Sequence, residues 1–144
     1  MMTTQATLRA SGSRPQILLV EDDPAVRRSL QLLLHGYGFE ARAYASGTAM
    51  LADSMCVQAI GLVADYRIPD IDGLEILSAL RARGWNGPAL LVTAHPSAHL
   101  ARLAEQAGYS QILEKPLREH QLGDALKSLM PRAQMSPSQA ISQG

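Results

Sequence analysis

Six polar residues that could carry chemistry stand at or just after the ends of short, mostly apolar runs: Glu21, Asp22, Asp23, Asp65, Thr93 and Lys115. Carboxylates held close together repel one another and raise each other's pKa unless a cation neutralises them. Hard oxygen ligands that leave room for water suit Mg²⁺. With such an ion bound, a carboxylate can act as the nucleophile toward a phosphoryl group, while a hydroxyl and an ammonium hold the remaining phosphoryl oxygens. These residue types therefore indicate phosphoryl transfer onto Asp65, provided that the fold brings them together.

A regular alternation of strands and helices is predicted to bring these residues together. Apolar runs predict strands over residues 16–20, 39–44, 60–64, 88–92 and 111–114. Between the runs, apolar residues recur at helical spacing, with Asp23 and Ser97 as N-caps and Gly108 as a stop. This alternation favours right-handed crossovers and a parallel five-stranded sheet covered by helices on both faces, a doubly wound α/β fold. The ligand crevice of such a sheet lies outside the carboxyl ends of its strands.

Several residues outside this set receive structural interpretations. A short helix is predicted to open at Ser46 and to continue as far as Met55. Asp70 and Asp72 are interpreted as turn formers around the neighbouring proline and glycine. Trp85 lies between Gly84 and Asn86, and we expect it to pack within a loop.

Composition excludes several classes of protein. The chain has 144 residues, and its 13 basic side chains are balanced by 13 acidic ones, which leaves no electrostatic footprint for nucleic acid or an anionic membrane. The single cysteine cannot form an intramolecular disulfide, so a reducing compartment is expected. The longest apolar runs are far shorter than a membrane-spanning helix. These features predict a soluble, cytoplasmic, single-domain protein.

The two ends of the chain differ in composition from its middle. Residues 1–14 are rich in Thr, Ser and Ala and lack acids, and residues 131–144 are Ser, Gln, Pro and Ala with almost no charge. We interpret them as a disordered leader, preferred over a transit peptide, and a disordered tail, with the folded domain over 15–130. The tail is too short for a helix-turn-helix domain, so we expect no DNA-binding domain in this chain. If the chain is a fragment, such a domain could have been removed.

Four stretches, in order along the chain, resemble the motif set of response-regulator receiver domains: Val20–Asp23, Val63–Gly73, Leu91–Ala94 and Glu114–Pro116. The resemblance covers about residues 15–130 and implies a CheY-like fold with the flavodoxin-like strand order 2-1-3-4-5. Residues 44–47 also resemble the nitrogen-fixation-regulator subgroup. The resemblance implies a signalling protein of a two-component phosphorelay, not an enzyme, that receives its phosphoryl group from a sensor histidine kinase.

The resemblance also assigns roles to residues at the acidic site. It makes Asp65 the phosphoacceptor and makes Asp22 and Asp65 direct side-chain ligands of Mg²⁺. The backbone carbonyl of Arg67 becomes a third ligand. Glu21 fills the other acidic position and reaches the metal directly or through water.

The remaining roles concern the phosphoryl group and the response to it. Thr93 becomes the switch hydroxyl, and Lys115 becomes the cation that binds the phosphoryl oxygens. Pro116 is expected to follow a cis peptide bond. Arg67 and His95 occupy the positions that flank the phosphoryl group in the family, where they would tune the access of water.

One position departs from the family pattern. Three residues before Lys115, where the family mostly has Tyr or Phe, this chain has Ile112. Isoleucine has no ring to rotate and no phenol to offer, and Tyr109 is not in register to replace it. We therefore expect signalling through the face formed by the family's fourth helix, fifth strand and fifth helix (α4-β5-α5 in family terms), here residues 98–107, 111–114 and the last helix. Homodimerisation or partner docking would change there, with less movement near Ile112 than near Thr93.

Other interpretations of the same residues remain open. Asp22 and Asp23 could simply cap the first helix. A haloacid-dehalogenase-like phosphatase would need a second acid where Arg67 stands, and a nucleotide-binding module would need a phosphate loop where the acids stand. A degenerate receiver that only binds partners would not need the complete acid, Thr and Lys set. His95 and His99 are interpreted as surface residues because no third metal ligand accompanies them.

Overall fold

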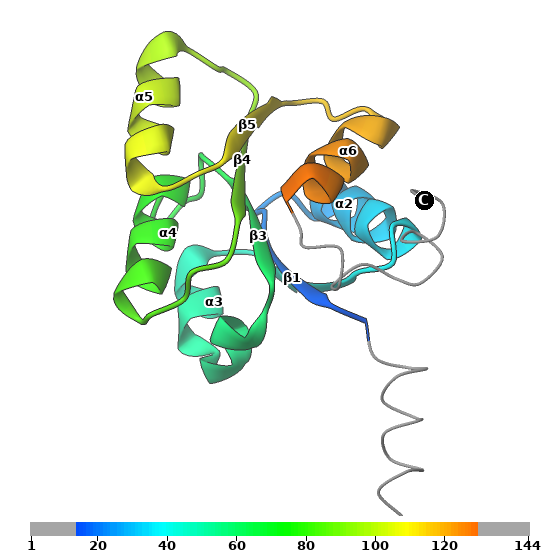
Figure 1. Ribbon diagram of the computed structural model, residues 1–144, viewed down its shortest axis with the longest axis horizontal. Coiled ribbons are helices and arrows are strands. Elements are labelled where there is room, and N and C mark those ends of the chain that lie inside the picture. The colour runs from blue at the N-terminus through cyan, green and yellow to red at the C-terminus, as the bar shows by residue number, and fades with distance from the viewer. Residues whose placement is uncertain (1–13, 130–144) are drawn as a thin grey trace, which may run out of the picture.

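The computed structural model describes residues 14–129, which form a five-stranded parallel sheet covered by helices (Figure 1). The strands are β1 (Gln16–Val20), β2 (Glu40–Tyr44), β3 (Gly61–Asp65), β4 (Ala89–Thr93) and β5 (Gln111–Glu114). They lie in the order β2-β1-β3-β4-β5, and every neighbouring pair is parallel. The predicted doubly wound fold and its strand order 2-1-3-4-5 are therefore confirmed. The predicted tail and all of the predicted leader except Arg14 lie outside the described residues.

Helices cover both faces of the sheet (Figure 1). They are α2 (Pro24–Gly36), α3 (Gly47–Ala52), a short 3₁₀ helix η1 (Ser54–Gln58), α4 (Gly73–Ala82), α5 (Ala98–Ala107) and α6 (Glu119–Leu129). Helices α2 and α6 pack on one face, and α3, α4 and α5 pack on the other. None of the helices within residues 14–129 has the length and apolar character needed to cross a lipid bilayer.

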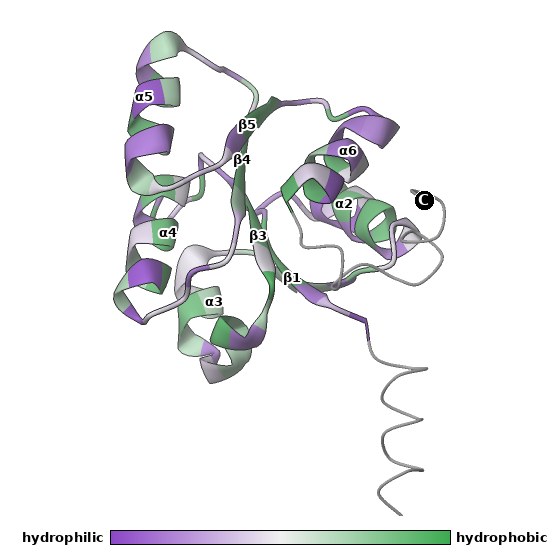
Figure 2. Ribbon diagram, in the orientation of Figure 1, coloured by the Kyte–Doolittle hydropathy of each residue, from purple (hydrophilic) through white to green (hydrophobic). Residues whose placement is uncertain are grey.

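The central strands are apolar on both sides because both of their faces are covered. In β1, Ile17 and Leu19 belong to the core beneath α2 and α6, whereas Leu18 and Val20 belong to the core beneath α3, α4 and α5. All five positions of β3 and of β4 are buried. Figure 2 shows the same contrast: the middle of the sheet is largely green, whereas α2, α5 and α6 carry both green and purple residues. This packing fixes the register of the strands, and so fixes where each strand ends.

The helix predicted over residues 46–55 is broken in the structure. Ser46 caps it as predicted, but α3 ends at Ala52. Asp53 then adopts an extended backbone and accepts a hydrogen bond from the amide of Met55, which starts the separate helix η1. Short acidic side chains compete in this way with helical hydrogen bonds. Met55 consequently lies on the surface, 43% exposed.

The two acids interpreted as turn formers have other roles. Asp72 is the N-cap of α4 and forms a reciprocal capping box with Glu75. Asp70 accepts hydrogen bonds from the amides of Gly47 (3.2 Å) and Thr48 (2.7 Å), which are distant in sequence. Asp72 therefore holds the end of the loop that follows β3 at the N-terminus of α4. Asp70 holds the middle of the loop at the N-terminus of α3.

Trp85 follows α4 in a loop, as expected, but its side chain packs into the core beneath α4 rather than only within the loop. Its indole N–H donates to the carbonyl of Ala59 at 2.8 Å. The guanidinium of Arg81 lies over the ring, 5.3 Å from its centre. The indole is 5% exposed, which makes it an internal reporter of unfolding.

Candidate functional site

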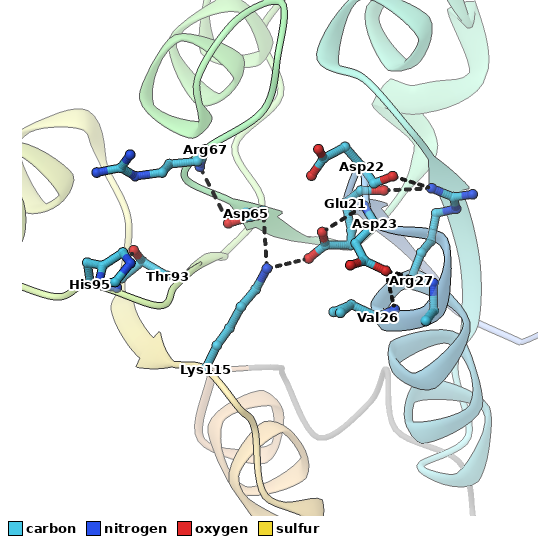
Figure 3. Close-up of polar contacts among 11 residues, drawn as sticks. Glu21, Asp22, Asp23, Val26, Arg27, Asp65, Arg67, Thr93, His95 and Lys115 are labelled. Carbon is cyan, nitrogen blue, oxygen red and sulfur yellow. Dashed lines mark hydrogen bonds and ion pairs between the residues drawn. The ribbon is translucent and has the colours of Figure 1, made fainter.

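Three carboxylates meet where β1 and β3 end (Figure 3). These strands are neighbours, with Val20 paired to Ala64, so the acids that follow them emerge side by side. Glu21, Asp22 and Asp65 each place a carboxylate oxygen within 4.8 Å of the others. Glu21 and Asp65 are buried, at 1% and 8% exposure, whereas Asp22 is exposed. The cluster is thus half enclosed by protein and half open to solvent.

Lys115 brings a positive charge to the two buried acids. It follows β5 and reaches across the end of β4, which lies between β3 and β5. Its Nζ donates to Glu21 Oε1 at 2.7 Å and to Asp65 Oδ2 at 2.9 Å. The Lys115–Pro116 peptide bond is cis, as predicted. Lys115 therefore bridges the carboxylate that follows β1 and the carboxylate that ends β3.

Burial and pairing act in opposite directions on the ionisation of this site. Burial raises the pKa of Glu21, and the hydrogen bonds from Lys115 and the Asp23 amide offset only part of that effect. Burial lowers the pKa of Lys115, but hydrogen bonds to Glu21 and to Asp65 raise it further, so it lies above its ordinary value. The pairing therefore favours the protonated form of Lys115, whereas burial disfavours the charged form of Glu21, a penalty that a cation relieves.

The loop between β1 and α2 is held by contacts that the sequence did not predict. Arg27, in the first turns of α2, donates from Nη1 to the carbonyl oxygen of Glu21 at 2.8 Å. The amide of Asp23 donates to Glu21 Oε2 at 3.1 Å. Asp23 itself caps α2 by accepting from the amides of Ala25 and Val26, as predicted. A basic residue one helical turn after the acidic pair was the only sequence signal for the role of Arg27.

Thr93 ends β4 beside the acidic cluster. Val92 is the register partner of Asp65, so Thr93 lies one residue beyond it. Thr93 is buried, 2% exposed, and its hydroxyl oxygen accepts a hydrogen bond from the amide of His95 at 3.2 Å. In Figure 3, Asp65 and the Lys115 ammonium lie between Thr93 on one side and Glu21 and Asp22 on the other.

The loop over residues 66–72 closes the other side of the site. The Arg67 amide lies 3.4 Å from Asp65 Oδ1, and its guanidinium points away from Asp65 in Figure 3. The loop ends at Gly73, whose amide donates to the carbonyl of Tyr66 at 3.0 Å. A Cβ at Gly73 would lie 2.9 Å from the carbonyl oxygen of Asp65 and 2.7 Å from Leu91 Cδ1. A glycine is therefore required for α4 to begin so close to Asp65.

Two hollows lie beside the acidic cluster. An open one is lined by Asp22, Arg67 and Asp72, among others. The other, about 510 Å³, is an apolar cleft between α2 and residues 115–117. The exposed carboxylate of Asp22 thus borders one hollow, and Lys115 borders the other.

Ile112 lies outside this cluster, on the side of the sheet covered by α5. It is half-buried and packs against the core beneath α3, α4 and α5. With Ala101, Glu105 and Tyr109 it lines a shallow hollow between α5 and β5. The structure therefore places the departure from the aromatic pattern on the surface from which we expect signalling.

Comparisons with known proteins agree on one family. Residues 17–127 match the family model described as "Response regulator receiver domain". The chain is 32% identical over 133 residues to "Transcriptional regulatory protein FixJ" of Bradyrhizobium diazoefficiens, covering 91% of this chain and 64% of that protein. It is 30% identical over 121 residues to "Transcriptional regulatory protein TdiR" of Thauera aromatica, covering 83% and 53% respectively. The chain therefore spans roughly half to two-thirds of the length of these relatives.

Solved structures support the same fold. The chemotaxis protein CheY4 of Vibrio cholerae superposes with a TM-score of 0.77 at 22% identity, covering 82% of this chain and 100% of that one. A sensor protein from Polaromonas sp. JS666 superposes with a TM-score of 0.71 at 30% identity, covering 81% and 95%.

Proposed function

The chain belongs to the receiver-domain family of response regulators, and from that premise we propose that it accepts a phosphoryl group on Asp65 from a sensor histidine kinase. Receiver domains are signalling modules rather than classical enzymes. The observation that carries the proposal is the convergence of three carboxylates and one ammonium at the ends of β1, β3 and β5. A purely structural ion pair would not need a third, exposed carboxylate beside it.

The acidic cluster fits a hard divalent cation, and we propose Mg²⁺. Carboxylate oxygens within 4.8 Å of one another, on an edge open to solvent, leave room for an ion that keeps part of its water shell. Asp22 and Asp65 would bind it directly, with the carbonyl of Arg67 as a third ligand and Glu21 in contact directly or through water. When bound, the ion supplies the positive charge that lets an anionic carboxylate approach an anionic phosphoryl group.

The chain's own groups then carry out the transfer. A carboxylate oxygen of Asp65 forms a bond to phosphorus, and the bond from phosphorus to the donor histidine nitrogen breaks. Lys115 already lies 2.9 Å from Asp65 Oδ2, so its ammonium can pass to a phosphoryl oxygen with little movement. The Thr93 hydroxyl, which now accepts from the His95 amide, can turn to donate to another phosphoryl oxygen.

The two hollows beside the acidic cluster offer separate places for the metal and for the phosphoryl donor. We propose that the polar recess at Asp22 holds the metal, while the apolar cleft between α2 and residues 115–117 receives the protein that carries the phosphohistidine. This arrangement keeps water from one side of Asp65 and leaves the other side to the hydrated ion.

The response is proposed to leave the site through Thr93. Movement of its hydroxyl would pull on the His95 amide and reshape residues 94–97, which lead into α5. The face formed by α5, β5 and α6 would then change its homodimerisation or its docking to a partner. Ile112 lies on this face but has no polar atom to follow the phosphoryl group, so we expect less change there than near Thr93.

The proposal is tested by labelling with acetyl phosphate in the presence of Mg²⁺. Wild-type protein is expected to take up one phosphoryl group, and Asp65→Asn is expected to take up none. Asp23→Asn is the matched control, because it removes a neighbouring carboxylate but keeps a side chain that can cap α2. Chelation with EDTA is expected to abolish labelling. Full labelling of Asp65→Asn, or undiminished labelling without metal, would refute the proposal.

A further inference from the structure

The loop over residues 66–72 is tied to the rest of the protein at several points. Its end is closed by the hydrogen bond from the Gly73 amide to the Tyr66 carbonyl. Its middle is tied to α3 through Asp70. A third contact lies just after the loop: the hydroxyl of Tyr109 donates to the carbonyl oxygen of Gly73 at 2.5 Å. This contact joins residues separated by 36 positions.

Tyr109 is itself rigidly held at the junction of α5 and β5. It follows Gly108, whose φ of 111° ends α5 in a left-handed turn. Its amide donates to the carbonyl of Ala104 at 2.9 Å, and the residue is 5% exposed. Burial raises the pKa of Tyr109, and the nearby charge of Asp72 raises it further, so the hydroxyl keeps its proton and remains a donor. A fixed donor of this kind restricts the position of its acceptor.

Gly73 lies in turn against the end of β3. The backbone of Gly73 lies so close to Asp65 that an added Cβ would be 2.9 Å from the Asp65 carbonyl oxygen and 3.3 Å from Tyr66 Cα. Gly73 also donates from its amide to the Tyr66 carbonyl at 3.0 Å, so its position is coupled to the backbone that directly follows Asp65. The Tyr109 hydroxyl, by holding the Gly73 carbonyl, therefore helps to hold the backbone of residues 65–67.

We propose that Tyr109 is a positioning residue for phosphoryl transfer at Asp65: by fixing Gly73 it holds the backbone that presents the Arg67 carbonyl and the Asp65 carboxylate to the metal. The inference rests on the proposed function. Tyr109 touches neither the metal site nor the phosphoryl group, and it acts through Gly73. Tyr109 also lines the hollow that contains Ile112. It therefore contacts both the α5–β5 surface and Gly73, at the end of the loop over residues 66–72. A ligand that alters Tyr109 from this hollow would alter metal binding, and metal binding would alter the hollow reciprocally.

The test is Tyr109→Phe, which removes the hydroxyl and keeps the ring. Tyr44→Phe is the matched control, because it also removes a hydroxyl that makes a 2.5 Å hydrogen bond, in that case to Asp53. Mg²⁺ affinity is measured from amide chemical shifts during titration. We expect the Mg²⁺ dissociation constant of Tyr109→Phe to rise about threefold to tenfold, below the roughly 10- to 100-fold typical of groups bonded directly to metal ligands. Amide hydrogen exchange of residues 66–73 in metal-free protein is expected to accelerate in Tyr109→Phe only.

The outcomes separate this inference from the proposed function. If wild type takes up no phosphoryl group, the proposed function fails, while the Mg²⁺ titration and the exchange rates still judge Tyr109. If Tyr109→Phe binds Mg²⁺ as Tyr44→Phe does, the inference is overturned whatever the exchange rates show. Should Tyr109→Phe not fold, the slowly exchanging hydroxyl proton of Tyr109 can be followed in wild type. Its resonance is expected to shift on addition of Mg²⁺, and an unmoved resonance would overturn the inference.

Discussion

Replacing Lys115 by methionine tests how much the ammonium stabilises the two buried carboxylates. The substitution keeps most of the side-chain stem and removes only the ammonium. It leaves the carboxylates of Glu21 and Asp65, which are 1% and 8% exposed, without the cation that bridges them at 2.7 and 2.9 Å. We expect Lys115→Met to lower the free energy of unfolding in metal-free buffer, because the buried carboxylates then face each other uncompensated.

Two quantities set an upper limit on the loss of unfolding free energy. At 2.7 Å and an effective dielectric constant of about 20, the Lys115–Glu21 attraction alone is about 6 kcal/mol, part of which is offset because the ammonium no longer has to be desolvated. The carboxylates can also escape by binding one proton. From the ordinary Glu pKa of 4.5, that proton costs roughly 4 kcal/mol at about pH 7.5 and roughly 1.4 kcal/mol at about pH 5.5. Because the Lys115 side chain is 20% exposed, we expect a loss of about 2–4 kcal/mol at the higher pH.

The sign of the pH dependence follows from the direction of the pKa shift. In Lys115→Met the folded-state pKa of Glu21 lies further above its unfolded value than in wild type. A raised carboxyl pKa contributes stability below the unfolded pKa and loses it as the pH rises through the folded pKa. The loss of unfolding free energy in Lys115→Met, relative to wild type, should therefore be largest near neutral pH and become smaller toward about pH 5.

Urea unfolding followed by the fluorescence of Trp85, the only tryptophan, measures this deficit. Lys127→Met, on the exposed surface of α6, is the matched control and should unfold as wild type does. Millimolar Mg²⁺ should restore much of the lost stability, because an ion that binds only the folded cluster stabilises it by mass action. Unfolding of Lys115→Met at the wild-type urea concentration in EDTA would contradict this prediction. So would a loss of stability that is as large in acid as at neutral pH.

Three further predictions concern other parts of the molecule. The Tyr44 hydroxyl and the Arg42 guanidinium lower the pKa of Asp53 from 3.8 to about 2, so its contribution to stability is present above pH 3.8 and is lost as the pH falls through about 2. Asp53→Asn should flatten the pH dependence of stability in that interval, measured by Trp85 fluorescence. Gly73→Ala should lower the free energy of unfolding by about 1–3 kcal/mol in urea titrations, because its Cβ has no room. Thr93→Ala should still be labelled by acetyl phosphate, but the amide shifts that beryllofluoride induces over residues 94–103 should shrink.

The sheet and the gathering of the acids were predictable because they depend on local patterns. Runs such as 17–20 and 61–64 are apolar at every position, which only a strand covered on both faces requires. Once the strands are parallel, their carboxyl ends coincide, and the residues that follow them must meet. The resemblance to nitrogen-fixation regulators is confirmed by FixJ among the relatives. The roles assigned to Asp65, Thr93 and Lys115 remain predictions.

The features that escaped prediction depend on hydrogen bonds between distant segments. Asp70 has the same turn-forming character whether or not Gly47 and Thr48 lie within reach. Arg27 and Tyr109 look like ordinary helix and core residues until their partners, the carbonyls of Glu21 and Gly73, are placed. No periodicity in the sequence encodes such contacts. These contacts become visible only when the tertiary structure places both partners.

The most direct test of the central claim is to locate the phosphoryl group. Wild-type protein is treated with acetyl phosphate and Mg²⁺, the acyl phosphate is reduced with borohydride, and the modified peptide is sequenced by mass spectrometry. We expect modification of Asp65 alone, because among the clustered acids it ends the central strand and contacts Lys115. Modification of Asp22, of Glu21 or of any serine in place of Asp65 would contradict it.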